Sequence, residues 1–265
     1  MRKVLEIKEC MKTFEGDGIP VTRAFPVPAM RDCDPFLLFD HFGPIHYEPG
    51  GATGVPAHPH CGFEAITYLL GGEVEHKDSW GGQAAIETGD IQWMTTGSGL
   101  IHSELVTDKF KKSGGIMQGL QIWVNLPMKD KQVKPWYQHI KKDDIPIIKE
   151  NENLEIKVLV GEVKGVKSTV QTFSPVSIFD VQFIAPEEID LDISKDQITM
   201  VYIIEGELQF SDENKIVSKE QMVYFDQSSD EIKLTSISTS GSYLVLAGKA
   251  LDEPMVRHGP FVTNT

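Results

Sequence analysis

The stretch Tyr68-Leu-Leu-Gly-Gly-Glu-Val74 recurs in the second half of the chain as Tyr202-Ile-Ile-Glu-Gly-Glu-Leu208. A second pair of matching segments follows the first, GDIQWM at 89–94 and EQMVYF at 220–225. The two pairs are offset by 134 and 131 residues, so the spacing within each copy is almost the same. Repetition at a near-constant offset indicates that one structural unit occurs twice. The sequence therefore predicts two copies of the same domain.

Each copy consists of short apolar runs separated by turn residues. Clusters of Gly, Pro, Asp or Ser bound these runs, which lie at 64–70, 91–94, 120–124, 156–160, 200–204, 222–225 and 243–247. Regular short strands of this kind are typical of a β-sandwich or barrel. We expect an all-β chain with one barrel at 1–130 and a second at 156–265. Residues 131–155, rich in Lys, Asp and Pro, are expected to connect them.

The composition restricts the classes of partner. The net charge is −14, with 39 acidic against 25 basic residues, which argues against direct nucleic-acid binding. The 3 cysteines include no CxxC pair, so a disulfide framework is not expected. No apolar run approaches the length needed to span a bilayer, and charges interrupt the first 18 residues, unlike a signal peptide. We expect a cytoplasmic protein that does not bind membranes, and a monomer.

The residues able to bind a metal are concentrated in the first copy. His58-Pro-His60 and His102-Ser-Glu104 each place two potential ligands two residues apart. In a strand, alternate side chains point to the same face, so each pair can converge on one ion. Three imidazoles and one carboxylate suit Fe, Zn, Cu, Ni or Mn. The sequence predicts one divalent transition metal at His58, His60, His102 and Glu104, and the ligand types alone do not decide among Fe, Cu, Ni, Mn, Co and Zn.

The alternative for either pair alone is a set of polar surface residues. The metal interpretation is favoured because both pairs, with glycine-rich turns at 71–72, 81–82 and 97–99, fall in one predicted barrel. The remaining histidines each stand alone and are expected to be structural or solvated: His41, His46, His76, His139 and His258. In the second copy, the repeat offsets match the four ligand positions to Asp192, Ser194, Lys233 and Thr235. That set does not reproduce the site, so the second barrel is expected to hold no metal.

Several longer stretches resemble one known family. HPHCGFEAITYLLGGEVEH at 58–76 is similar to the first cupin motif, with Glu64 and Gly71 at the motif's Glu and Gly positions. GDIQWMTTGSGLIHSE at 89–104 looks like the version of the second motif found in pirins, and the segments 34–44, 121–131 and 253–265 are also pirin-like. The resemblance to the pirin family implies a bicupin: two tandem jelly-roll (double-stranded β-helix) barrels with iron in the N-terminal barrel only. In many other cupins the motif-one Glu, here Glu64, is the acidic ligand, whereas the pirin pattern favours Glu104. Cys61 stands where the family usually has an arginine that a protein partner would contact.

The resemblance also implies a function. Some pirins cleave the flavonol quercetin with O2, and animal pirin is a nuclear cofactor of transcription regulators. The first hypothesis is therefore a quercetin 2,3-dioxygenase type of oxygenase acting on a small aromatic substrate and O2, in which Glu104 accepts the proton of the flavonol hydroxyl. Gln121 and Trp123, on the alternating stretch LQIWV, are predicted to line the substrate pocket, although Trp123 also suits a core position. The alternative hypotheses are a non-enzymatic, iron-dependent redox sensor that acts through a protein partner, and an enzyme for some other phenolic metabolite.

Overall fold

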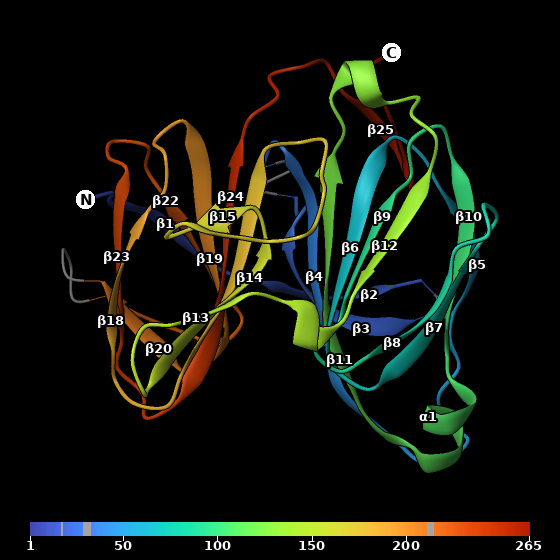
Figure 1. The fold of residues 1–265 in the computed structure, drawn as a ribbon, viewed down its shortest axis with the longest axis horizontal. Helices are drawn as coiled ribbons and strands as arrows, with labels where there is room; N and C mark the ends of the chain where they lie inside the picture. The colour runs from blue at the N-terminus through green and yellow to red at the C-terminus, as the bar shows by residue number, and fades with distance from the viewer. Residues whose placement is uncertain (17, 29–32, 211–214) are drawn as a thin grey trace. The chain divides into compact units, whose positions relative to one another are not determined.

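The computed structural model describes residues 1–16, 18–28, 33–210 and 215–265 and is almost entirely β (Figure 1). Its contacts divide the chain into two compact units. Unit 1 comprises Met1–Cys10 and Ile145–Ala250, and unit 2 comprises Met11–Asp144 and Leu251–Thr265. None of the described helices has the length and hydropathy required to cross a bilayer.

Unit 2 contains a sheet of seven strands and a sheet of four. The large sheet has the order β12 (Trp136–Ile140), β9 (Ile91–Thr95), β6 (Phe63–Gly71), β11 (Gly115–Asn125), β4 (Phe36–Tyr47), β3 (Ile19–Phe25) and β2 (Met11–Glu15). The small sheet has the order β5 (Gly54–His60), β10 (Leu100–Val106), β7 (Glu73–Asp78) and β8 (Gln83–Glu87). Unit 2 also holds helix α1 (Asp108–Ser113), the short helices η1 (Met128–Asp130) and η2 (Lys142–Asp144), and a hairpin of β25 (Val256–His258) with β26 (Phe261–Thr263).

Unit 1 repeats the same arrangement. Its large sheet has the order β1 (Val4–Glu9), β22 (Gln221–Phe225), β19 (Gln197–Glu205), β24 (Gly241–Lys249), β17 (Val176–Phe183), β14 (Leu154–Val160) and β13 (Ile147–Lys149). Its small sheet has the order β18 (Glu188–Asp192), β23 (Glu231–Ser236), β20 (Glu207–Phe210) and β21 (Lys215–Ser218). A further hairpin pairs β15 (Glu162–Val163) with β16 (Val166–Lys167).

The strand orders of the two units correspond position by position. The repeated segments occupy equivalent strands, β6 and β7 in unit 2 and β19 and β20 in unit 1. A seven-stranded sheet facing a four-stranded one, with antiparallel pairing, is a jelly roll. The predicted all-β fold with two copies of one barrel is confirmed.

The two units do not divide at residues 130 and 156, the boundaries expected from the sequence. Residues 131–144 belong to unit 2 because β12 pairs with β9 at the edge of the large sheet. The first ten residues belong to unit 1, where β1 takes the equivalent place beside β22. Both are edge strands whose side chains are almost all half-buried or exposed, so their sequences lack the apolar run that marks a central strand. The last fifteen residues, Leu251–Thr265, belong to unit 2.

The interiors of the two barrels differ. In unit 1 a single large cluster of buried apolar residues fills the barrel and includes Phe179, Val201 and Val223. Among the described residues of unit 2, one cluster of buried apolar side chains surrounds Phe63 and Met94 and another surrounds Leu69 and Ile86. Unit 2 also contains a cavity and buried polar groups.

The repeat offsets align the predicted metal ligands of unit 2 with residues that lie on the outside of unit 1. Along β18 and β23, Leu191 and Ile232 are buried, so their neighbours Asp192 and Lys233 face outward. Lys233 Nζ donates to Glu188 Oε1 at 2.6 Å on that outer face, and Ser194 is exposed.

Candidate metal centre

The register of the small sheet places the predicted ligands on one face. Strand β10 lies between β5 and β7, and His102 is paired with His58 on one side and with Asp78 on the other. Residues directly opposite one another in an antiparallel pair share a face. Glu104, two residues after His102, is paired with His76 of β7. The inner face of this sheet therefore carries polar groups from three adjacent strands.

Three of the predicted residues form a compact cluster. His58, His60 and His102 each place a ring nitrogen so that the three atoms lie within 4.8 Å of one another. The ring centroids are 4.3 to 4.9 Å apart. His58 Nδ1 is 2.8 Å from the carbonyl oxygen of Pro56, so a neutral ring donates from Nδ1 and keeps its lone pair on Nε2. The cluster thus offers three imidazole nitrogens to a common point.

The cluster contains buried polar atoms without protein partners. Both ring nitrogens of His102 and Nδ1 of His60 are buried and have no hydrogen-bond partner. Each such atom costs on the order of 1–3 kcal/mol if nothing compensates it. A divalent transition metal would accept the lone pairs of imidazoles arranged in this way. The residues present therefore fit a metal ion.

Burial keeps His60 and His102 neutral. The pKa of His60 is lowered to about 2, chiefly by burial and also by the neighbouring His102 and His58. Burial likewise lowers the pKa of His102 to about 2, with His58 and His76 adding to the effect. Because only a neutral imidazole binds a metal, both rings are in the binding form at any pH near neutrality.

Glu104 lies beside the cluster and is not part of it. Its Oε1 accepts hydrogen bonds from Thr67 Oγ1 at 3.2 Å and from Gln92 Nε2. Within the described part of the chain, Oε1 accepts both hydrogen bonds made to Glu104, so Oε2 is left for another partner. Glu104 and the three histidines line the same cavity. The structure thus brings the three imidazoles together and holds the carboxylate next to them by one oxygen.

Glu64 faces the opposite side of its sheet. Its neighbours on β6, Phe63 and Ala65, belong to the interior cluster of unit 2, so the side chain of Glu64 points away from that interior. Glu64 Oε1 accepts hydrogen bonds from Trp93 Nε1 at 3.0 Å and from Thr95 Oγ1 at 2.9 Å. The geometry therefore favours Glu104 over Glu64 as the acidic group of the site.

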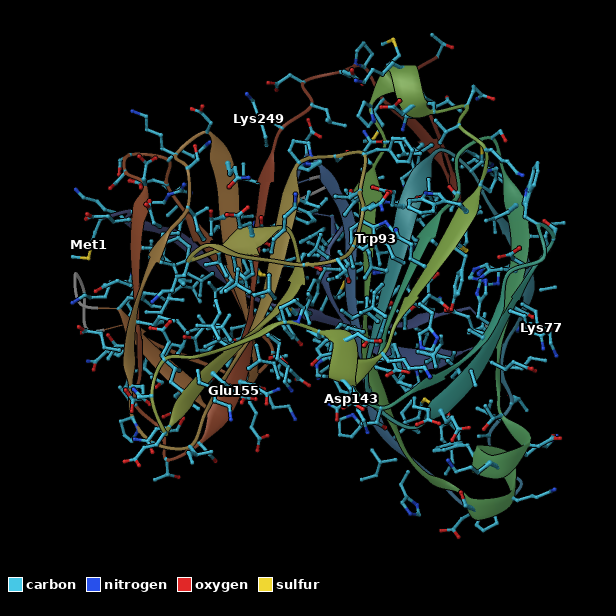
Figure 2. The ribbon with its side chains drawn as sticks, in the orientation of Figure 1. Met1, Lys77, Trp93, Asp143, Glu155 and Lys249 are labelled. Carbon is cyan, nitrogen blue, oxygen red and sulfur yellow. The ribbon has the colours of Figure 1, made fainter. Side chains whose placement is uncertain are left out.

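His76 is a site residue that the sequence pattern did not single out. Its side chain is fully buried, its Nε2 lies 3.0 Å from Asp78 Oδ2, and its ring centroid is 5.4 Å from that of His102. The next residue, Lys77, is half-exposed on the outside of the unit (Figure 2). Strict alternation along GEVEH, with Val74 inward, would have identified His76 as an inward residue.

The other solitary histidines lie outside the cluster. His139 Nε2 is 2.8 Å from Asp90 Oδ2, and His41 Nε2 is 2.9 Å from Gln118 Nε2. His46 and His258 are exposed.

A cavity of about 580 Å³ within unit 2 adjoins the histidines. Gln121 and Trp123 both line it, as do apolar side chains such as Val21, Phe42 and Met117. The Trp123 ring stacks on Phe63 with centroids 4.3 Å apart and meets His60 edge-on at 5.2 Å. Trp123 therefore serves as a core residue on one side and a wall of the cavity on the other.

The C-terminal segment forms another part of the wall. Arg257 places its guanidinium carbon 5.0 Å above the Trp123 ring and donates from Nη1 to the carbonyl of Leu37 at 2.9 Å. At the turn that follows His60, Val262 N donates to the Cys61 carbonyl at 2.9 Å and Cys61 N donates to the Pro260 carbonyl at 3.1 Å. Gly62 in that turn has φ +86°, and a Cβ there would lie 1.9 Å from the Val262 carbonyl oxygen. The close approach of residues 251–265 thus requires glycine directly after the histidine pair.

Substitution of each glutamate by glutamine distinguishes the two candidate acidic ligands. Glu104→Gln should weaken binding of Fe(II) or Co(II) by at least about tenfold, because it removes the charge beside the imidazoles. Glu64→Gln should leave metal affinity within about twofold, because its side chain is on the other face of β6. Competition with a chromophoric chelator measures both. A larger loss for Glu64→Gln than for Glu104→Gln would reassign the ligand.

The buried imidazoles should also make the metal-free protein less stable at low pH. The pKa of each ring rises from about 2 in the folded chain to an ordinary 6.5 on unfolding, so the unfolded state binds more protons between those values. The free energy of unfolding should therefore decrease as the pH falls below 6.5, by at most about 1.4 kcal/mol per pH unit for each ring.

Tryptophan fluorescence in denaturant titrations from pH 7 to pH 5 follows this effect in unit 2, because all 4 tryptophans lie there. The variant His60→Gln with His102→Gln should show a shallower dependence on pH. Equal pH dependence in the two proteins would show that these rings are not the source.

Comparisons with known proteins agree with this fold. Residues 18–124 match the Pirin family model, and residues 178–265 match the model of the pirin C-terminal cupin domain. A Pseudomonas aeruginosa protein named "Putative quercetin 2,3-dioxygenase" is 37% identical over 269 residues, which cover 100% of this chain and 93% of that protein. Human Pirin is 35% identical over 256 residues, covering 95% of this chain and 84% of the relative.

A solved structure extends the likeness to three dimensions. The crystal structure of quercetin 2,3-dioxygenase from Acinetobacter baumannii superposes with a TM-score of 0.91 at 34% identity, covering 100% of this chain and 93% of that one. The matches span both barrels and almost the full length of these relatives. The chain therefore belongs to the pirin family.

Proposed function

We propose that the chain is a metal-dependent dioxygenase that opens flavonols or related phenolics with O2, using Fe(II) held by His58, His60, His102 and Glu104. The observation that carries the proposal is the cluster of three imidazoles at the wall of an apolar cavity. The names of the Pseudomonas and Acinetobacter relatives support this choice of reaction.

The ligand set and the cavity suit this chemistry. A bound Fe(II) would lower the pKa of a coordinated phenol and make O2 reactive toward it. Three imidazoles and one carboxylate do not fill an octahedral coordination sphere, so positions remain for substrate and O2. The cavity volume falls within the range of small-molecule sites, and its wall is mostly apolar and aromatic. A flat phenolic ring would pack against Trp123 with its hydroxyl directed at the histidines.

Glu104 would receive the substrate proton. Its Oε1 accepts from Thr67 and Gln92, and the residue lines the cavity. The other oxygen, Oε2, would bind the metal and accept the proton when that bond loosens. A carboxylate held in this way can accept the proton of a phenolic hydroxyl that enters the cavity. The apolar wall excludes water, which strengthens the attraction between the carboxylate and that hydroxyl.

Anaerobic reconstitution with Fe(II), followed by quercetin and air, tests this function. The wild type should bleach the flavonol absorbance and release carbon monoxide, whereas Glu104→Ala should be slower by about 100-fold or more because the base is lost. His46→Ala, which removes an exposed histidine outside the cavity, is the matched control and should react like the wild type. A wild-type rate no greater than that of Glu104→Ala would eliminate the proposal.

A further inference from the structure

Tyr137 contacts two residues that adjoin the candidate metal centre, His76 and Gln92. It lies on β12, in the segment expected from sequence to be a connection, and is paired with Met94 of β9. Its ring stacks on the ring of His76, with centroids 4.1 Å apart and planes at 11°. Its hydroxyl donates to Gln92 Oε1 at 3.2 Å. One side chain therefore supports the histidine next to His102 and the amide that holds Glu104.

The hydrogen bonds of Gln92 define which way its amide points. A carboxylate only accepts, so Gln92 presents Nε2 to Glu104 Oε1. Its Oε1 then faces away and needs a donor, which the Tyr137 hydroxyl supplies. Burial raises the pKa of Tyr137 well above its ordinary value, and the charge of Glu104 adds to this effect, so the hydroxyl remains a donor.

Thr67 completes the support of Glu104. Its hydroxyl accepts from Gln92 Nε2 at 3.3 Å and lies within donating distance of two acceptors, Glu104 Oε1 at 3.2 Å and Gln121 Oε1 at 3.0 Å. Because the hydroxyl has one proton for these two acceptors, Gln92 is the principal donor that holds Glu104 Oε1, and it restricts a long side chain that would otherwise sample several rotamers. Without the tyrosine hydroxyl, the Gln92 amide loses the partner of its oxygen and gains the freedom to turn that oxygen toward the carboxylate.

We propose that Tyr137 is a positioning residue which, through Gln92, fixes Glu104 beside the three imidazoles and so sets how tightly the four residues bind a divalent cation. The inference rests on the part of the proposed function that assigns Glu104 to the metal centre. It does not depend on which substrate the site converts. Outer partners of metal ligands typically change affinity by about 10–100-fold, and Tyr137 stands one hydrogen bond further out.

The substitution Tyr137→Phe isolates the hydroxyl because the ring that stacks on His76 stays. Co(II) is the probe, with affinity measured by chelator competition and ligand geometry by its visible absorption bands. Tyr137→Phe should weaken Co(II) binding about three- to tenfold and alter the band intensities. In a Glu104→Gln background the same substitution should change affinity by less than about twofold, because the group being positioned is gone.

Two further variants provide a control and a second test of the same hydrogen bonds. Tyr202→Phe removes the hydroxyl of a fully buried tyrosine in unit 1 and should leave Co(II) affinity unchanged. Gln92→Met removes the amide and keeps the length of the side chain. It should reproduce the loss, again only when Glu104 is present, and it serves as the test if Tyr137→Phe does not fold.

Unchanged affinity in Tyr137→Phe, or an equal loss in the Glu104→Gln background, would overturn the inference. A protein that binds Co(II) with the expected coupling but does not convert quercetin would contradict the dioxygenase proposal alone. A wild type without affinity for Co(II) would contradict both.

Discussion

The site in unit 2 depends on three imidazoles whose nitrogens point at one another, two of which, His60 and His102, are buried and uncharged. His102 is 3% exposed and neither of its ring nitrogens has a hydrogen-bond partner. Such an arrangement is unfavourable in isolation, because each unpaired polar atom has lost its hydration. The rest of the barrel must therefore hold the three rings in place. It does so through the pairing of β10 with β5 and β7, and through the C-terminal segment packed on the turn after His60.

The two barrels show how one fold accommodates different interiors. Both have the same strand order, but one large apolar cluster fills the interior of unit 1, whereas unit 2 has a cavity and a polar network beside its apolar clusters. At the equivalent strands of the small sheet, unit 1 turns Leu191 and Ile232 inward. The offsets taken from the repeated segments point instead to Asp192 and Lys233, which face outward. A shift of one residue in a strand exchanges its two faces, so an offset measured on one pair of strands does not transfer to every other pair.

Much of the fold was predictable because its signals are local. The apolar runs and glycine turns mark the central strands, and the repeated segments show that the barrel occurs twice. The edge strands β1 and β12 were not predictable in this way, since neither contains an apolar run. From the sequence, the residues of β1 are expected in the first barrel and those of β12 in the connection. The histidine pairs could be recognised because alternation on a strand brings i and i+2 together. The orientation of Glu104 and the roles of Gln92 and Tyr137 depend on contacts between strands far apart in sequence, which no spacing in the chain encodes.

The central claim is that one ion is held by side chains of unit 2 alone. Crystals of the Fe(II)-loaded protein, measured on both sides of the iron absorption edge, locate that ion directly. The account predicts a single anomalous peak at about 2.0–2.3 Å from one ring nitrogen each of His58, His60 and His102. A peak bound elsewhere, a peak in the apolar barrel of unit 1, or a peak that one of the three rings does not reach would contradict it.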